Sequence, residues 1–166
     1  MSCSAPIGFR IANASDRGAL REFLDRLSPN TIKQRYLMPA RSLAGELGDR
    51  ELRRLVDRNE SEHMVVLALD GAEVRGVGEF VRHGAQDAEL ALLVEDDFQH
   101  RGIGQCLFGI LEQLALERGL SAFTAEIAYS NARMRGLLRA TGRRIQTQLG
   151  YGSLQVRLLL DSAATP

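Results

Sequence analysis

Cysteine and lysine are scarce in this sequence, and tryptophan is absent. Cys3 and Cys106 are the only cysteines, and Lys33 is the only lysine among 21 basic residues. Two cysteines so far apart give neither a disulfide framework nor a metal-ligand spacing, and the three histidines are too scattered to indicate a metal site. We therefore expect reduced thiols and no bound metal, with Cys106 as a buried structural thiol in a helix.

The sequence also lacks a net charge and a long hydrophobic run. Its 21 basic and 21 acidic residues cancel, so it has no broad positive field that would hold nucleic acid or an anionic membrane. Apolar runs such as residues 64–69 are far shorter than the ~20 residues of a membrane-spanning helix, and residues 1–10 contain no apolar segment of the signal-peptide type. These absences predict a cytoplasmic protein with no nucleic-acid or membrane partner.

The composition that remains is that of an ordinary globular domain. Hydrophobic residues make up 45% and charged residues 25% of the 166 residues, which is typical of one domain spanning 1–166. The amino-terminal part of the sequence predicts one strand and three helices from its apolar periodicity. The strand is expected at 7–11, and the helices at 20–27, from 32 to Pro39, and at 47–59.

The rest of the sequence alternates between strand and helix patterns. A run rich in Val and Leu ends at Asp70-Gly71, which is a hairpin signal. The periodicities predict strands at 63–70, 74–83, 88–94 and 122–128, helices at 103–118 and 131–140, and two last strands around Gly150–Gly152 that end at Leu160. Hairpin-linked strands followed by a strand, helix, strand crossover predict a mixed sheet with helices on its faces, an α/β or α+β arrangement of three layers.

A glycine-containing segment joins a predicted strand to the longest predicted helix. Unpaired backbone N–H groups converge at such a helix start, where the helix dipole is positive. Gly102 and Gly104 lack the Cβ atoms that would keep a pyrophosphate from the backbone, and Arg101 adds a positive charge. The dinucleotide-binding pattern fails because Leu107 stands where its third glycine is needed. The segment therefore predicts a site for another phosphate-bearing cofactor.

The same segment resembles the signature of the GNAT superfamily of acyl-CoA N-acyltransferases. Gln99, Gly102 and Gly104 match that signature in full, and the predicted order of strands and helices follows the family over nearly the whole chain. The resemblance implies a GNAT-like three-layer fold, in which a mixed central sheet of about seven strands carries helices on both faces. It also implies an N-acetyltransferase that uses acetyl-CoA.

The resemblance further implies where coenzyme A binds. The backbone at Leu93 and Val94 would pair with the pantetheine arm, as an unpaired strand edge can pair with an added strand. Asn131 would meet that arm from the other side, although an asparagine at this point is equally well explained as a helix cap. The segment that would hold the pyrophosphate, which we call the cofactor segment, comprises Gln99, His100, Arg101, Gly102, Ile103, Gly104 and Gln105.

Acetyl transfer to an amine requires a group that accepts a proton. A lysine-like amine with a pKa near ~10.4 is neutral in only about 1 molecule in 2,500 at pH 7. A carboxylate in a partly dry cleft can take this proton and accelerate the reaction roughly 10²- to 10⁴-fold. Glu89 is our first choice because it lies on the strand that leads into the cofactor segment, and Glu79 and Glu126 are the alternatives.

The likeness is greatest to the catalytic domain of the Pat-type bacterial protein lysine acetyltransferases, which carry an Ala-Glu pair on this strand, as Ala88-Glu89 does here. The segment around Leu27-Ser28-Pro29 also resembles that branch. It implies that the acceptor is a protein lysine and that the acceptor cleft is bordered by Ser28, Thr31, Arg35 and Tyr36. A small-molecule amine or amino-acid acetyltransferase, and a non-catalytic acyl-CoA-binding module, are the alternatives; either a monomer or a homodimer is compatible.

The sequence departs from many GNAT enzymes at one position. Leu138 stands where they have a tyrosine that protonates the leaving thiolate, and the Pat-type branch shares this departure. The proton must then come from elsewhere, and water can suffice because the coenzyme A thiol is acidic. Tyr129 and Tyr151 are possible substitutes, but a tyrosine is more often a packing residue with a satisfied hydroxyl.

Overall fold

The structure is a computed structural model that describes residues 6–38 and 43–163. Seven strands and five α-helices occur in this part of the chain. In chain order they are β1 (Gly8–Ile11), α1 (Arg17–Arg26), α2 (Pro29–Tyr36), α3 (Glu46–Val56), β2 (His63–Asp70), β3 (Glu73–Arg82), β4 (Asp87–Val94), α4 (Ile103–Glu117), β5 (Ala122–Ala128), α5 (Ala132–Ala140), β6 (Arg143–Leu149) and β7 (Ser153–Ala163). Short 3-10 turns lie at Ala14–Asp16 and Asp96–Phe98.

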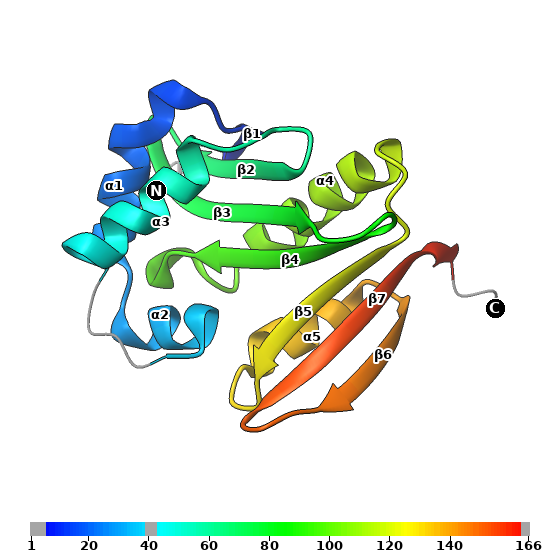
Figure 1. Cartoon of the computed structure of the whole chain (residues 1–166). Helices are drawn as coiled ribbons and strands as arrows, with labels where there is room; N and C mark the ends of the chain where they lie inside the picture. Colours follow the sequence, from blue (N-terminus) through cyan, green and yellow to red (C-terminus); the bar gives the residue numbers. More distant parts are fainter. Residues whose placement is uncertain (1–5, 39–42, 164–166) are drawn as a thin grey trace.

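The strands form one mixed sheet between two layers of helices, as the sequence predicts. Their order is β1-β2-β3-β4-β5-β7-β6, and every neighbouring pair is antiparallel except β4 and β5. Helices α1, α2 and α3 cover one face of the sheet, whereas α4 and α5 cover the other (Figure 1). Each layer has its own apolar core, with Phe23 on the first face and Phe80, Phe108 and Phe123 on the second.

The sheet splits between its two parallel strands. The β4–β5 ladder contains only the pairs Asp87↔Ala122, Ala88↔Phe123 and Glu89↔Thr124. Beyond Glu89 the strands diverge in a V, while β4 continues to pair with β3 up to Val94 (Figure 1). From residue 90 to residue 94, β4 therefore has a strand neighbour on one side only.

Three expectations about individual residues need correction or cannot be followed. Cys106 is exposed rather than buried, because the apolar row of α4 runs through Ile103, Leu107 and Leu111 and leaves the thiol outside it. The second helix ends at Tyr36, where the chain turns into a left-handed conformation. Cys3 and Pro39 lie outside the described residues.

No helix in the described part of the chain is both long and apolar enough to span a bilayer.

Candidate active site

The V between β4 and β5 opens into a cleft with a volume of about 710 Å³. Helix α2 forms one wall, the start of α4 and the segment before it form the end, and the start of α5 forms the opposite wall. Both faces of β4 contribute to the lining, so the cleft passes through the sheet from the side of α4 and α5 to the side of α2. Two ligands can therefore approach the same point from opposite faces.

The start of α4 presents backbone N–H groups to this cleft. No side chain caps the helix, and its first intrahelical bond runs from the amide of Cys106 to the carbonyl of Gly102, 3.0 Å apart. The preceding amides thus have no intrahelical acceptor and attract an anion. Gly102 has φ of +79°, and a Cβ atom there would meet nothing within 4 Å. The backbone is bare at this position, as the sequence predicts.

Gly104 has a second structural reason to be glycine. A Cβ atom at this position would lie 2.9 Å from Cδ1 of Leu137 on α5. The lack of a side chain therefore lets α4 and α5 approach each other closely across the end of the cleft. The two glycines of the segment act differently, since Gly102 provides the turn and Gly104 provides the close approach.

Side-chain hydrogen bonds tie the segment before α4 to helix α2. Gln99 Nε2 donates to the carbonyl oxygen of Val94 at 2.9 Å and to Thr31 Oγ1 at 3.3 Å. Asp96 accepts from Ser28 Oγ at 2.7 Å and from Thr31 Oγ1 at 3.0 Å. Burial alone would raise the pKa of Asp96, but these hydroxyl donors outweigh it and lower the pKa. The carboxylate thus stays ionised and fixes α2 beside the cofactor segment.

Arg101 lies at the surface beside the cleft and is not among its lining residues. Its guanidinium stacks on the ring of Phe98 at 4.6 Å, and that of Arg75 stacks on the same ring at 4.5 Å. Arg75 is in turn paired with the buried carboxylate of Glu95 at 3.0 Å. Arg101 therefore adds positive charge next to the α4 start without filling the site.

Asn131 lies on the opposite wall, just before α5. Its side-chain oxygen accepts a hydrogen bond from the amide of Met134 at 3.0 Å, so it caps the helix. The residue also lines the cleft, and the cap uses only its oxygen, which leaves the amide nitrogen as a donor. The capping and cofactor-binding interpretations are therefore compatible.

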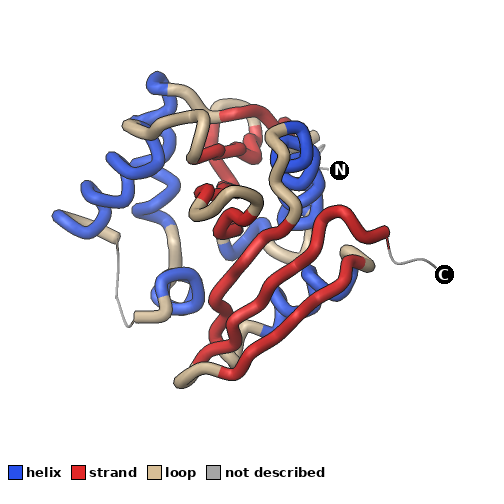
Figure 2. Tube along the Cα trace, turned by 45° about the vertical axis from the view of Figure 1, so that its right-hand side comes forward, coloured by secondary structure: helices blue, strands red, loops and turns tan. Residues whose placement is uncertain are grey.

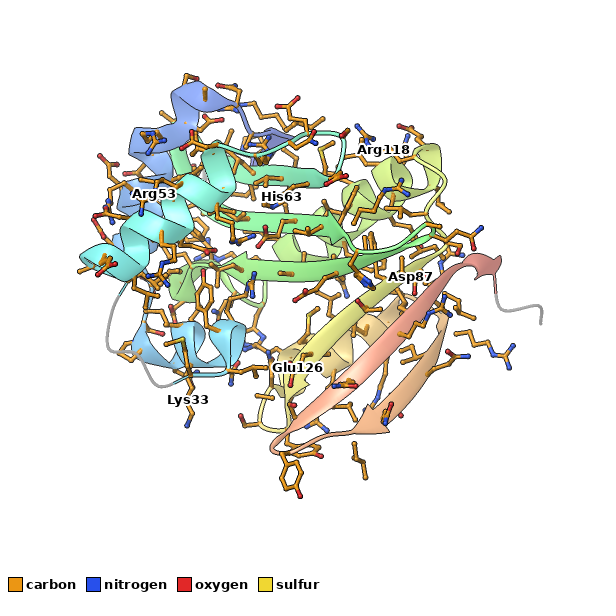
Figure 3. The ribbon with its side chains drawn as sticks, viewed as in Figure 1. Lys33, Arg53, His63, Asp87, Arg118 and Glu126 are labelled. Atoms are coloured by element: carbon orange, nitrogen blue, oxygen red, sulfur yellow. The ribbon has the colours of Figure 1, made fainter. Side chains whose placement is uncertain are left out.

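Glu89 and Glu126 are the two carboxylates in the cleft. Glu89 is exposed and belongs to the last β4–β5 pair, at the point where the two strands separate. Thr124 on β5 is the strand partner of Glu89, and Glu126 lies two residues beyond Thr124, farther towards the open end of the V (Figure 3). Glu126 accepts a hydrogen bond of 2.6 Å from the hydroxyl of Ser153. Glu89 is thus the carboxylate nearest to the apex of the V.

The third candidate base, Glu79, is excluded by its surroundings. Its side chain is buried, with 4% of the residue exposed, and it does not line the cleft. It accepts hydrogen bonds from Arg35 at 2.8 Å, Arg54 at 2.6 Å and His63 at 2.5 Å. Burial would raise the pKa of Glu79, but the hydrogen bonds from His63 and Arg54 and the arginine charges outweigh it and lower the pKa strongly. A carboxylate so fully bonded cannot serve as a base.

Glu79 and its partners Arg35, Arg54 and His63, which we call the Glu79 cluster, instead stabilise the α2 wall of the cleft. Arg35 and Tyr36 both line the cleft from the end of α2. Arg35 is fixed by Glu79, and the hydroxyl of Tyr36 donates to Glu51 on α3 at 2.7 Å. Burial, followed by the charge of Glu51, raises the pKa of Tyr36, so its hydroxyl remains protonated. Glu79 and Glu51 thus position two residues that line the cleft from α2.

Most residues predicted for the site do surround one cleft. The lining includes Thr31, Arg35, Tyr36, Glu89, Leu93, Val94, Gln99, His100, Gly102, Ile103, Gly104, Gln105 and Asn131. Ser28 is the exception besides Arg101, because it caps α2 and bonds Asp96 instead. Gln34 and Arg133 also line the cleft and were missed. Helical spacing could have indicated Gln34, which lies three residues after Thr31 on the same helix.

Neither substitute tyrosine lies in the lining of this cleft. The hydroxyl of Tyr129 donates to the carbonyl of Gly150 at 2.9 Å, and Tyr151 is fully exposed at the β6–β7 turn. Leu138 is buried in the core beneath α5. Among the described residues, Tyr36 is therefore the tyrosine that lines the cleft.

The sequence is similar to known acetyltransferases. Residues 25–142 match the acetyltransferase (GNAT) family. The chain is 30% identical over 131 residues to acetyltransferase PA5475 of Pseudomonas aeruginosa, a match that covers 76% of this chain and 69% of that protein. It is 36% identical over 95 residues to acetyltransferase Pat of Mycolicibacterium smegmatis, which covers 55% of this chain but only 28% of that protein.

Solved structures share the fold. The GNAT domain of S. lividans PAT superposes with a TM-score of 0.82 at 22% identity, over 91% of this chain and 89% of that one. The PaiA N-acetyltransferase of Thermoplasma acidophilum, solved in complex with coenzyme A, superposes with a TM-score of 0.70 at 18% identity, over 92% and 98% of the two chains. At these identities the likeness establishes the three-layer fold.

Proposed function

Because the chain belongs to the acetyltransferase (GNAT) family, we propose that it transfers an acetyl group from acetyl-CoA to a primary amine, and that this amine is a protein lysine side chain. The observation that carries the proposal is the cleft itself. One end presents the uncapped start of α4, one side presents the unpaired edge of β4, and a free carboxylate lies at its apex. These three features suit a diphosphate, an amide-bearing arm and an amine, respectively.

The amides from Gly102 to Gln105 hold the pyrophosphate, and the charge of Arg101 supports them from the surface. The backbone of Leu93 and Val94 bonds the pantetheine arm, and the side-chain nitrogen of Asn131 faces it from α5. Acetyl-CoA supplies the acetyl group as an activated thioester. The role of the chain is to fix that thioester within reach of an amine that enters from the side of α2.

Glu89 accepts the proton that the amine loses when its nitrogen attacks the acetyl carbon. The C–S bond then breaks, and the amide product and the coenzyme A thiolate leave. Water protonates this thiolate, since the tyrosines considered for that role point elsewhere. Glu89 is favoured over Glu126 because it lies at the apex of the V, whereas Glu126 is held by Ser153 farther out.

The protein-lysine acceptor is supported by two observations. The chain is similar to acetyltransferase Pat over 95 residues, and the cleft shares Glu89, Ala125 and Glu126 with a second, open space instead of ending in a closed pocket. A small amine acceptor is the alternative, for which an enclosed pocket would be expected.

Replacing the proposed base gives the direct test. We expect Glu89→Gln to lower kcat about 10²- to 10⁴-fold while leaving the Kd for acetyl-CoA unchanged, because Glu89 lies away from the α4 start. Coenzyme A release with lysine peptides and small amines measures turnover, and calorimetry measures binding. Asp25→Asn, on an exposed side chain of α1, is the matched control. Wild-type turnover in Glu89→Gln would refute the base assignment, and tight acetyl-CoA binding without any amine-dependent release by the wild type would favour a binding module.

A further inference from the structure

One half of the sheet face on the α2 side is left uncovered. Helices α1, α2 and α3 cover this face over β1 to β4, whereas the described helices leave it open over β6, β7 and most of β5, where only α2 makes contact (Figure 1 and Figure 2). Strand alternation makes the helix-covered side of these strands apolar, as at Phe123 and Val156, and the open side polar. We call the open side the polar groove; it has a volume of about 460 Å³, and its polar side chains are Glu89, Thr124, Glu126, Gln146, Gln148, Gln155 and Arg157.

The polar groove is continuous with the proposed active site. Glu89, Ala125 and Glu126 line both the groove and the cleft. Glu89 thus stands at the junction of the two spaces, at the point where the amine must arrive. A molecule whose amine reaches Glu89 can therefore also contact the groove.

The charge of the groove is negative. Arg157 is neutralised by Asp87, with 2.9 Å between their charged atoms. Glu89 and Glu126 form no ion pair with any described residue, and Glu126 accepts only the neutral hydroxyl of Ser153. Two carboxylates therefore face a groove whose arginine is already paired. Glu89 is the proposed base for the acceptor amine, which leaves the charge of Glu126 available to pair with a second cation.

The remaining groove residues suit a polypeptide. Gln148 on β6 lies directly opposite Gln155 on β7, and Gln146 is next along the same side of β6. All three side chains are exposed. A side-chain amide both donates and accepts hydrogen bonds, as a peptide bond does. A polyamine only donates, so it would leave the donor half of each glutamine unused, whereas a peptide backbone matches both halves.

We propose that the polar groove binds the polypeptide segment around the acceptor lysine, and that Glu126 selects segments with a second positive charge near that lysine. This rests on the proposed function. Thr124 and Glu126 are two strand residues apart, which is roughly 7 Å, and β4 and β5 also diverge between Glu89 and Glu126. Residues along an extended peptide advance ~3.3 Å each. With Glu89 at the lysine amine, Glu126 meets a basic side chain within about three residues of it.

The test uses three peptides of seven residues, each with one central lysine. Arginine, glutamine or glutamate flanks the lysine two residues away on both sides, and spermidine is a fourth substrate. We compare kcat/KM for wild type, Glu126→Gln and Glu126→Lys. Glu126→Gln retains an acceptor for Ser153, so the fold of β5 and β7 is preserved. Glu117→Gln on α4, on the opposite face, removes the same charge away from the groove and is the matched control.

We expect the wild type and the control to prefer the arginine peptide over the glutamine peptide by about three- to fivefold at low salt, as partly exposed charge pairs do. Glu126→Gln removes this preference, Glu126→Lys reverses it towards the glutamate peptide, and added salt weakens it in the wild type. Three outcomes overturn the inference. The wild type uses all three peptides equally well, Glu126→Gln keeps the wild-type preference, or spermidine is preferred over every peptide. If the wild type acetylates none of the four substrates, the proposed function itself fails.

Discussion

The buried carboxylate of Glu79 gives the sharpest prediction about stability. Glu79→Gln keeps the size of the side chain but removes its charge, so that Arg35 and His63 lose their carboxylate partner and Arg54 keeps only Glu51. Only 4% of Glu79 is exposed, so water cannot replace the lost interactions. Removing one member of a buried charge cluster leaves the other charges uncompensated in a medium of low polarity.

The expected loss is large for a single substitution. Breaking a buried ion pair from one side costs about 3–5 kcal/mol of unfolding free energy. For a chain of this size, each kcal/mol lowers Tm by about 2–4 °C, so Glu79→Gln should lower Tm by roughly 6–20 °C. The matched control is Glu46→Gln on α3, whose carboxylate is 87% exposed and lies 3.5 Å from Arg50. An exposed pair of this kind should contribute less than about 0.5 kcal/mol.

The pH dependence of this effect has a definite sign. The pKa of Glu79 is lowered in the folded chain, whereas an unfolded glutamate titrates near ~4.3. The stability that Glu79 contributes is therefore fully present above the unfolded pKa and is lost as pH falls towards the folded pKa. The difference in unfolding free energy between wild type and Glu79→Gln should therefore shrink as pH falls below about 4.3.

Urea unfolding followed by circular dichroism, repeated between pH 3.5 and pH 7, measures both quantities. A second readout comes from activity, because Glu79 fixes Arg35 on the acceptor wall. We expect KM for the acceptor to rise in Glu79→Gln while the Kd for acetyl-CoA stays near that of the wild type. A stability loss no larger than that of Glu46→Gln, or a difference that grows as pH falls below about 4.3, would refute this account of the cluster.

Two further pairs of substitutions test the packing and the cofactor segment. Gly78→Ala places a Cβ atom 2.8 Å from Cδ1 of Leu111, so overpacking should lower the free energy of unfolding by about 1–3 kcal/mol. Gly109 lies on α4, and a Cβ atom there meets nothing within 4 Å. Gly109→Ala should therefore raise the free energy of unfolding by about 0.5–1 kcal/mol, and thermal unfolding measures both changes. Asp96→Ala removes the acceptor that ties α2 to the cofactor segment and should raise the Kd for acetyl-CoA several-fold by calorimetry. Its exposed neighbour gives the control Asp97→Ala, and equal affinities in the two variants would show that the tie does not order the segment.

The sequence predicted the elements whose patterns are local. Strand β5 was predicted with its observed bounds, because Ala122–Ala128 lies between a glycine turn and a helix start. The start of α4 was predicted because a glycine pair followed by a long apolar helix period is itself a local pattern. The short turn at Asp96–Phe98 was missed, since a polar segment of this length has no periodicity that separates a turn from a loop.

The environment of single carboxylates could not be predicted in the same way. Glu79 and Glu89 both lie on strands near the cofactor segment, and both were reasonable bases. Their difference arises from the β3–β4 register and from the packing of α2 and α3, which bring Arg35 and Arg54 to Glu79 and leave Glu89 free. Those contacts join residues separated by 25 and 44 positions in the chain, so no local pattern indicates them.

The short β4–β5 ladder determines how the whole molecule can be used. If these parallel strands paired along their full length, the backbone edge at Leu93 and Val94 would be satisfied and the two faces of the sheet would be separated. Because pairing stops at Glu89↔Thr124, one face can hold the acetyl donor against α4 and α5 while the other admits an amine beside α2. Under the proposed function, the carboxylate at the last pair stands where the two faces meet, which is the physical reason for proposing Glu89 as the base.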